Sequence, residues 1–433
     1  MTGRALAGKA RGGSVGAGLD AAVIVVGGGP GGAACAWALA REGLDVLVLD
    51  RARFPRDKPC GEYLSPQVSR YLAQMGVLER VEGAGAAQLA GMVVRSPGGA
   101  EIHGRFVAAH GFRGFRDRGL ALRRRALDPI LLDAARQAGA RVAEGARVTG
   151  VATDDRGRVR GVTVAEADGG ERRLSASLVV GADGLRSIVA RRLGLAHASR
   201  WPRRVALVTH FRGVAGLGDV GEMHVERGGY LGVAPLGDGV ANVAVVVPTS
   251  RGREIAGDAV GFLARWIARR PHLAPRFEGA RRISPVMATG PFASSVRRAW
   301  TPGAALVGDA ADFFDPFTGE GIYAAMRGAE LLVPLAADAA RALGTGRART
   351  RAALTADRAL AEYERLRRAD FAGKWAVERF VGAAVAVPAL MNRAARALTK
   401  RRDMADLLVG VTGDFVPARE VLRGGYLLRL LLS

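Results

Sequence analysis

Three glycines near the start of the chain have the spacing of a phosphate-binding turn. Gly27, Gly29 and Gly32 form a GxGxxG pattern, in which Pro30 follows the second glycine. The first glycine permits a tight turn, the second lets backbone N–H groups approach a pyrophosphate, and the third lets helix and strand pack closely. Asp50 follows about 20 residues later, where a carboxylate can accept hydrogen bonds from a ribose. These residues predict that the chain binds a dinucleotide.

The elements around these glycines support that interpretation. Residues 21–26 are continuously apolar and rich in valine and isoleucine, which predicts a buried parallel strand. Residues 33–41 have helical periodicity, and residues 45–49 form a second short strand ending at Asp50. Strand, helix and strand follow in the order of a βαβ unit, whose helix N-terminus attracts phosphate. A second GxGxxG match begins at Gly216, but no helix follows it, so we assign it no nucleotide.

Two later segments also end an apolar strand with a turn and an aspartate. Residues 178–182 lead into Asp183, and we interpret that turn as mainly structural, with Asp183 and Ser187 as helix caps. Residues 304–308 lead into Asp309, and a turn rich in proline and glycine then opens a helix over 322–332. That helix would direct the positive end of its dipole at whatever lies before residue 321.

These segments together resemble one enzyme superfamily. Residues 54–66 are similar to the PRxKxCGxxLSP loop of the geranylgeranyl reductase branch of the FAD-dependent oxidoreductases. The same superfamily includes monooxygenases of the para-hydroxybenzoate hydroxylase type and flavin-dependent halogenases. Residues 181–187 resemble its ADGxxS motif, and residues 308–321 resemble its GDA…P…GxG motif. The resemblance covers roughly residues 20–345.

The resemblance implies an α/β fold with a Rossmann-type, glutathione reductase-like FAD-binding domain. An antiparallel-sheet substrate domain is inserted into it, and a helical segment follows at the C-terminal end. The implied boundaries are an FAD-binding domain at 21–90, 121–198 and 284–345, a substrate domain at 91–120 and 199–283, and a helical region at 346–433. The Gly/Ala-rich composition of residues 1–20 separately predicts a disordered leader.

The resemblance also implies roles for individual residues. FAD is the expected cofactor, with Arg124 against its pyrophosphate, Val148 on a strand over 141–151 against its adenine, and Asp309 on its ribityl hydroxyls. The helix N-terminus would face the N1–C2=O edge of the flavin and stabilise negative charge there after reduction. The residues expected at that edge or near the flavin ring are Cys60, Pro316, Gly319, Gly321 and Ile322.

Several reactions are compatible with these motifs. We favour a monooxygenase that uses a flavin C4a-hydroperoxide to hydroxylate a hydrophobic aromatic, quinone or polyketide-derived molecule. The alternative is a reductase of isoprenoid double bonds, which the loop around Cys60 favours. Halogenation is rejected because the related halogenases need a lysine after this loop, and the sequence has none between Lys58 and Lys374. It also lacks their WxWxIP motif. A fourth hypothesis is that the protein is a non-catalytic flavin sensor. Because the sequence predicts one dinucleotide-binding unit, NAD(P)H is expected to dock transiently as electron donor, and a separate reductase is the alternative source of electrons.

The composition of the chain indicates which partners, disulfides and metal sites to expect. The 433 residues carry a formal net charge of +22, almost entirely from arginine, without the interleaved aromatic residues of a nucleic-acid surface. The two cysteines form no CxxC pair and the six histidines no metal-ligand spacing, so we expect neither a disulfide nor a metal. We expect a cytoplasmic monomer or homodimer with a hydrophobic small-molecule substrate. Arginines near apolar residues after 390 leave open weak contact with a membrane surface.

Overall fold

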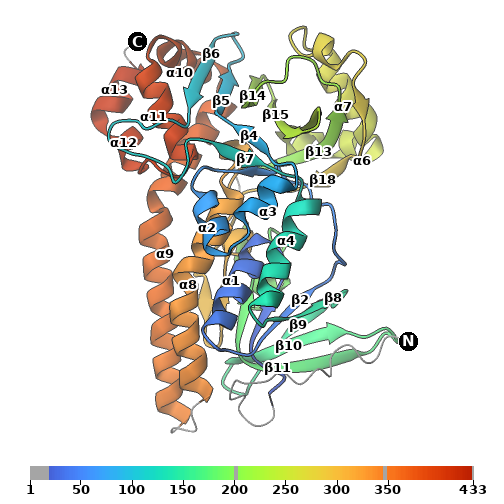
Figure 1. Ribbon diagram of the computed structural model, residues 1–433, viewed down its shortest axis with the longest axis vertical. Helices are drawn as coiled ribbons and strands as arrows, with labels where there is room; N and C mark the ends of the chain where they lie inside the picture. The colour runs from blue at the N-terminus through green and yellow to red at the C-terminus, as the bar shows by residue number, and fades with distance from the viewer. Residues whose placement is uncertain (1–18, 199–202, 345–348, 432–433) are drawn as a thin grey trace.

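The apolar strand at the start of the chain forms the centre of a parallel sheet (Figure 1). The computed structural model describes residues 19–198, 203–344 and 349–431, so most of the leader predicted at 1–20 lies outside the described residues. β1 (Ala21–Val26) pairs in parallel with β2 (Val46–Asp50) and with the second half of β11 (Glu171–Gly181). The sheet continues with β8 (Arg141–Glu144) beyond β2, and with β21 (Ala304–Leu306) and β20 (Trp300–Thr301) beyond β11.

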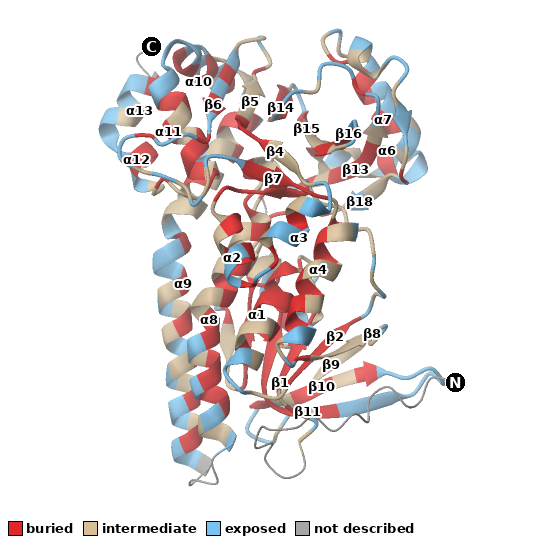
Figure 2. Ribbon diagram, in the orientation of Figure 1, coloured by how far each residue is buried: buried red, intermediate tan, exposed pale blue. Residues whose placement is uncertain are grey.

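Helices and an antiparallel extension cover this sheet. α1 (Pro30–Arg41) packs between α4 (Arg124–Gln137) and α8 (Gly321–Gly344), in front of the strands in Figure 1. Because both faces of its strands are covered, β1 is almost entirely buried, as Figure 2 shows. The first half of β11 turns outward and pairs with β10 (Val159–Ala165), which pairs in turn with β9 (Val148–Thr153). This arrangement confirms the predicted Rossmann-type fold.

A second, mostly antiparallel sheet lies above the first in Figure 1. Along β13 (Arg204–Arg212) side chains alternate between its faces: Leu207 packs toward α7 (Ala259–Ala268), and Val208 packs toward the C-terminal helices. The other strands of this sheet are β5 (Gly91–Arg95), β6 (Glu101–Arg105), β14 (Val220–Glu226), β15 (Gly229–Gly237), β16 (Val240–Pro248), β17 (Arg281–Arg282) and β18 (Met287–Thr289).

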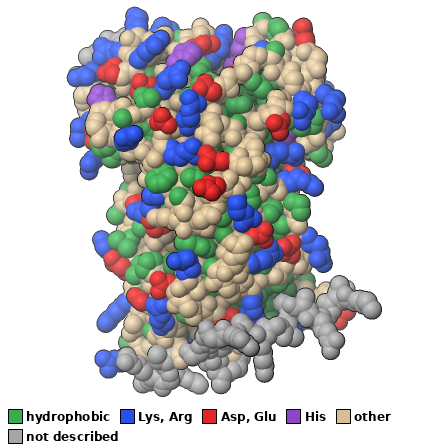
Figure 3. Space-filling view, in the orientation of Figure 1, with side chains coloured by type: hydrophobic (Ala, Val, Ile, Leu, Met, Phe, Trp, Pro, Cys, Tyr) green, Lys and Arg blue, Asp and Glu red, His purple; other side chains and the backbone are tan. Residues whose placement is uncertain are grey.

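The C-terminal part of the described chain is helical. α9 (Arg349–Ala386) runs beside α8 for most of its length and reaches the second sheet (Figure 1). α10 (Pro388–Lys400) and α11 (Arg402–Thr412) pack on β6, and α12 (Arg419–Leu422) and α13 (Gly424–Leu431) follow. No described helix has both the length and the apolar character needed to cross a membrane. On the face shown in Figure 3, basic side chains are interspersed with acidic ones.

Shorter elements connect these layers. A three-stranded sheet of β3 (Tyr63–Leu64), β7 (Gly119–Ala121) and β4 (Ala87–Leu89) lies between the two large sheets. The remaining elements are α2 (Val68–Gln74), α3 (Leu78–Gly83), α5 (Ile188–Arg192), β12 (Ala196–Ala198), α6 (Gly252–Gly257), β19 (Ser294–Val296) and the 3-10 turns at Thr249–Arg251, Ala274–Phe277, Gly308–Ala310 and Pro316–Thr318.

Some element boundaries differ from those predicted from the sequence. The strand expected over 141–151 is two strands, because Gly145 adopts a φ of +75° between β8 and β9 and turns the chain. The helix expected over 322–332 continues to Gly344 as α8. The second sheet ends at Thr289 in β18, a few residues beyond the predicted end of the substrate domain at 283. Asp183 and Ser187 cap α5 as expected, since they accept hydrogen bonds from the N–H groups of Ile188 and Ala190.

Candidate active site

A cavity of about 450 Å³ lies where the parallel sheet, the second sheet and α9 meet. Its wall includes the start of α1 at Gly29, the loop at Cys60 and the start of α8 at Gly321. The two helix starts are close in space, because a Cβ built on Gly31 would lie 3.3 Å from Cβ of Ala325 in α8. The predicted residues that line this cavity are Gly29, Pro30, Cys60, Arg124, Asp309, Pro316, Gly319, Gly321 and Ile322.

The glycine turn has the tight geometry that its spacing predicts. Gly27 adopts a φ of +103°, and a Cβ on Gly32 would lie only 1.8 Å from the carbonyl oxygen of Gly27. Only glycine fits there, so the start of α1 can approach the end of β1. Gly29 is the N-cap of α1, but among the described residues no side chain caps the helix, and its first turn has no acidic residue. The N–H groups of this turn are therefore available to bind an anion.

Asp50 supports this turn directly. Its Oδ2 accepts a hydrogen bond of 2.7 Å from the N–H of Gly28, and its Oδ1 accepts one of 2.8 Å from Ala52. A carboxylate has further lone pairs, so these bonds do not prevent it from accepting a ribose hydroxyl. Neither Asp50 nor Val148, which is partly buried in β9, lines the cavity itself. Their predicted contacts with the adenosine half of FAD stay predictions.

Basic side chains surround the end of the glycine turn. A Cβ on Gly29 would lie 3.5 Å from Nη2 of Arg124, whose guanidinium is held by the carboxylate of Asp128 at 2.6 and 2.8 Å. Burial favours the neutral form of Arg124, but Asp128 outweighs this effect and raises the pKa of Arg124. Arg56 also pairs with Asp128, at 2.9 Å. A buried guanidinium beside a free helix N-terminus suits a pyrophosphate.

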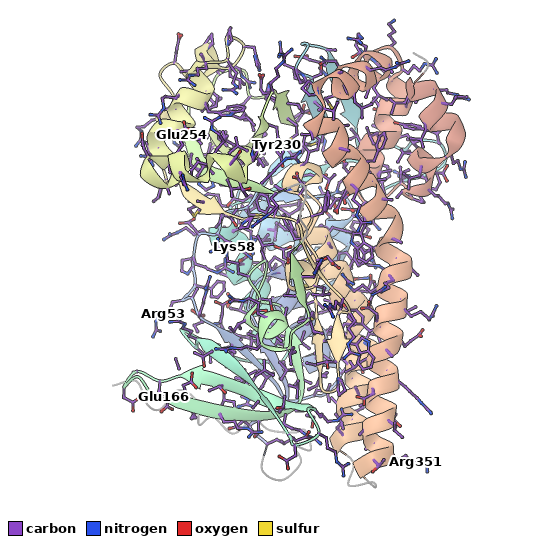
Figure 4. The ribbon with its side chains drawn as sticks, turned by 180° about the vertical axis from the view of Figure 1, so that it is seen from behind. Arg53, Lys58, Glu166, Tyr230, Glu254 and Arg351 are labelled. Carbon is purple, nitrogen blue, oxygen red and sulfur yellow. The ribbon has the colours of Figure 1, made fainter. Side chains whose placement is uncertain are left out.

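Lys58 adds a further positive charge to this region and is labelled in Figure 4. A Cβ on Gly184 would lie 3.2 Å from its Nζ. Burial and the nearby Arg124 lower the pKa of Lys58, while Asp309 opposes them. Burial raises the pKa of Asp309, and Lys58 counteracts it. The space between Lys58 and Asp309 suits a polar segment of a ligand that carries negative charge at one end.

The start of α8 is shaped to face a planar ligand. Gly319 adopts a φ of +73°, and a Cβ there would lie 2.8 Å from the ring of Tyr63. The turn before it is fixed by Asp315, whose Oδ1 accepts hydrogen bonds from the N–H of Phe317 and from the hydroxyl of Tyr230. Oδ2 of Asp315 pairs with Arg204 at 2.7 Å. These contacts fix the turn against the second sheet, on which Figure 4 labels Tyr230.

The residues present therefore fit FAD. An uncapped helix N-terminus with Arg124 beside it suits the pyrophosphate. Asp309 also lines the cavity, where a Cβ on Gly321 at the start of α8 would lie 3.8 Å from its Oδ1. At the other end, the first turn of α8 would direct backbone N–H groups at the flavin edge that becomes negative on reduction. Bound there, FAD would supply hydride-transfer chemistry to a substrate in the same cavity.

The sequence analysis missed Glu62, which connects the Cys60 loop to the second sheet. Its Oε1 accepts a hydrogen bond of 2.9 Å from the N–H of Arg124, and its Oε2 accepts bonds from His210 at 2.8 Å and Asn242 at 3.1 Å. Asn242 also donates to the carbonyl oxygen of Cys60 at 2.8 Å. Glu62 is non-glycine at a φ of 60°, a strained conformation that its contacts maintain. The only sequence signal was the match of its loop to the family pattern.

Comparison with known proteins agrees with this geometry. The model of a family described as "FAD binding domain" matches residues 20–349. The chain belongs to this FAD-binding family. It is therefore an FAD-dependent oxidoreductase, as the resemblance implied.

Characterised relatives include reductases. Over 324 residues the chain is 30% identical to digeranylgeranylglycerophospholipid reductase 2 of Methanopyrus kandleri. This alignment covers 73% of this chain and 77% of the relative. Over 320 residues it is 33% identical to menaquinone reductase of Mycobacterium tuberculosis, covering 70% of this chain and 73% of the relative.

Solved structures share the fold over nearly the whole chain. The myxobacterial chondrochloren halogenase, a variant FAD-dependent halogenase, matches with a TM-score of 0.73 and 25% identity, covering 88% of this chain and 90% of that one. A geranylgeranyl bacteriochlorophyll reductase-like protein of Thermoplasma acidophilum matches with a TM-score of 0.68 and 22% identity, covering 95% of this chain and 96% of that one. One fold thus serves enzymes with different reactions.

Proposed function

We propose that this protein is an FAD-dependent reductase that saturates carbon–carbon double bonds in the isoprenoid chain of a hydrophobic substrate. One observation carries this proposal: the Cys60 loop, which matches the reductase branch, lines the same cavity as the starts of α1 and α8. The two relatives described above are named as reductases, and one of them as acting on a digeranylgeranyl lipid.

The substrate side of the cavity is suited to an apolar chain. The second sheet contributes aliphatic side chains, and the segments around α9 contribute aromatic ones, so a prenyl chain would displace water from both. The apolar residues on this wall include Leu89, Met92, Ala206, Val208, Met223, Val233, Ala244, Val246, Phe292, Phe313, Phe314, Phe371 and Trp375. We propose that NAD(P)H docks transiently as electron donor.

Within this proposal the chain's own residues bind, orient and exclude water. The network of Glu62, His210 and Asn242 holds the Cys60 loop at the cavity wall, and the Asp315 contacts hold the turn at Gly319. Because these networks join the flavin-binding domain to the second sheet, they would keep a bound cofactor and a bound substrate at a constant distance. A fixed distance is a main contribution of a protein to hydride transfer.

The proposal is tested under strictly anaerobic conditions. Protein loaded with FAD and supplied with NADPH, or with dithionite in a parallel sample, is incubated with a geranylgeranyl lipid and with a prenylated quinone. Mass spectrometry should show the addition of two hydrogens for each double bond reduced. The control is the same protein stripped of FAD.

The oxygenase predicted from the sequence gives a different outcome. With phenols and labelled oxygen gas, a monooxygenase incorporates one labelled oxygen atom and makes no product without oxygen. That result, together with unchanged prenyl chains in the anaerobic samples, would replace the reductase proposal with the monooxygenase.

A further inference from the structure

A buried cluster of ionisable side chains lies where the turn before α8 meets α9 and the loop after α11. Nζ of Lys374 lies 3.5 Å from Oε1 of Glu320 and contacts Oδ1 of Asp414. The same ammonium lies 4.6 Å from the centroid of the Tyr323 ring. The side chains of Glu320 and Asp414 are 5% and 0% exposed, so their charges are shielded from bulk solvent.

Glu378 extends this cluster into the cavity. It follows Lys374 by four residues on α9, so both side chains lie on one face of the helix, and both line the cavity. Within the described part of the chain Glu378, which is partly buried at the cavity wall, forms no hydrogen bond or ion pair. The cluster therefore contains one ammonium and three carboxyl groups.

This imbalance of charge requires that the carboxyl groups of the cluster hold at least one proton. One lysine can compensate one carboxylate, and further negative charges in a dry interior repel each other strongly. Lys374 contacts Glu320 and Asp414, and Asp315 is paired with Arg204. Among the described residues no cation contacts Glu378, whereas Glu320 and Asp414 share Lys374. The titratable or charged groups around it are Glu320, Lys374, Asp315 and Asp414, with Tyr63 and Tyr323 beside them.

The electrostatic environment agrees with this assignment. Burial, and after it the nearby Glu320, raise the pKa of Glu378 to about 8, and Lys374 opposes this shift only in part. Burial also raises the pKa of Glu320, to about 7, and there Lys374 is the largest opposing influence. At neutral pH a neutral carboxylic acid at position 378 would thus face the cavity.

We propose that Glu378 is a catalytic residue that holds this proton and donates it to the substrate. The inference rests on the proposed function. In the reduction, the π bond of the substrate breaks, and the hydride from the cofactor forms a C–H bond at one carbon. The O–H bond of Glu378 breaks at the same time, and its proton forms the second C–H bond. The carboxylate left behind takes up one proton from solvent, and NAD(P)H restores the reduced cofactor.

A first experiment needs no substrate. Infrared difference spectra of the FAD-loaded protein, recorded as a function of pH, should show the carbonyl band of a neutral carboxylic acid at pH 7, which disappears as the pH rises through about 8. The part of this band that disappears near pH 8 should be lost in Glu378→Gln, whereas a contribution from Glu320, whose pKa is raised to about 7, should remain. Glu362→Gln is the matched control, because it makes the same change on the same helix at a residue paired with Arg365 on the surface. Its spectrum should keep the band.

A second experiment measures delivery of the proton. With pre-reduced enzyme and a geranylgeranyl lipid, Glu378→Gln should slow saturation of the double bond about 100-fold, while reduction of FAD by NADPH stays unchanged. Glu378→Asp keeps an acid and should recover part of the rate, and Glu362→Gln should match the wild type. Flavin absorbance and melting temperature report whether each variant is folded.

The outcomes separate this inference from the proposed function. If the wild type reduces no prenyl chain, the proposed function fails, and the proton-donor role fails with it, whatever the infrared band shows. If the wild type is active, a Glu378→Gln variant with the wild-type rate and pH profile would overturn the donor role alone. An acid band titrating near pH 8 that is absent from the wild type, or that survives in Glu378→Gln, would also overturn it.

Discussion

Glu62 and His210 are 148 residues apart in the chain, yet Oε2 of Glu62 and Nε2 of His210 lie 2.8 Å apart in the interior. Their side chains are 2% and 1% exposed. One belongs to the loop that borders the flavin site and the other to β13 of the second sheet. The pair therefore joins the Cys60 loop to the second sheet, and its loss should affect the structure of both.

Removal of the Glu62 carboxylate should destabilise the protein strongly. In Glu62→Ala three buried donors lose their acceptor: the ring of His210, the amide of Asn242 and the N–H of Arg124. We expect the free energy of unfolding to fall by about 3 kcal/mol. Chemical denaturation at a fixed FAD concentration measures it. Glu79→Ala, at an exposed residue of α3, should change it by less than about 0.5 kcal/mol. Equal stability of the two variants would contradict the role of Glu62.

A methyl group at Gly32 should impair cofactor binding. The added Cβ would lie 1.8 Å from a backbone oxygen of Gly27, so the helix start must move away from β1. We expect at least about a tenfold loss of FAD affinity, equivalent to about 1.4 kcal/mol. Quenching of flavin fluorescence on binding measures the affinity. Gly83→Ala is the control, since nothing lies within 4 Å of a Cβ at that position in α3. Unchanged FAD affinity in Gly32→Ala would mean that the pyrophosphate binds elsewhere.

The two cysteines should differ in reactivity. Cys35 is fully buried in α1, and burial raises its pKa to about 12, so almost no thiolate is present at neutral pH. Cys60 is only partly buried and lines the cavity. A thiol reagent should therefore modify one cysteine in the native protein and both in denaturant, and saturating FAD should slow the native reaction. Cys60→Ser should abolish it, whereas persistence of the reaction in that variant would place the reactive thiol at Cys35.

The local parts of this site were predictable from the sequence, and the long-range parts were not. The turn from Gly27 to Gly32 depends on steric rules within one βαβ unit, which a spacing pattern records directly. Glu62 and His210 meet only after two sheets have packed, and no local pattern encodes that packing. The cluster around Lys374 was missed for the same reason, because helical periodicity places a residue on a face without identifying what lies opposite. The interpretation of Asp50 as a ribose ligand did not anticipate its bond to Gly28.

Acid should destabilise the second sheet through Glu222. Burial acts to raise its pKa, but hydrogen bonds from Arg276 at 2.8 Å and His224 at 2.9 Å outweigh this and lower it from 4.5 to about 2. The folded protein binds the ionised form more favourably, so this stability is present above pH 4.5 and is lost as the pH falls toward 2.

This pH-dependent contribution of Glu222 to the free energy of unfolding is on the order of 3 kcal/mol. Glu222→Gln should thus be less stable than the wild type at pH 6, and the difference should shrink toward pH 2. Denaturant unfolding across this range measures it, with the exposed Glu254→Gln, labelled in Figure 4, as the control. A difference that does not depend on pH would show that Glu222 contributes only packing.

The opposite pH dependence is expected at Glu378. Its pKa is raised from 4.5 to about 8, so the folded state favours the protonated acid. This contribution to stability is complete below pH 4.5 and is lost as the pH rises through about 8, because the unfolded chain ionises freely over that interval. A glutamine cannot ionise and avoids that loss.

The melting temperature of Glu378→Gln relative to the wild type should therefore increase between pH 5 and pH 8 and level off above. Melting curves at fixed FAD concentration measure the difference. Glu362→Gln removes an ionised, surface-paired carboxylate from the same helix and should show no such increase. A Glu378→Gln variant whose relative stability does not change with pH would mean that Glu378 is already ionised at neutral pH. Its carboxyl group would then hold no proton to donate to a substrate.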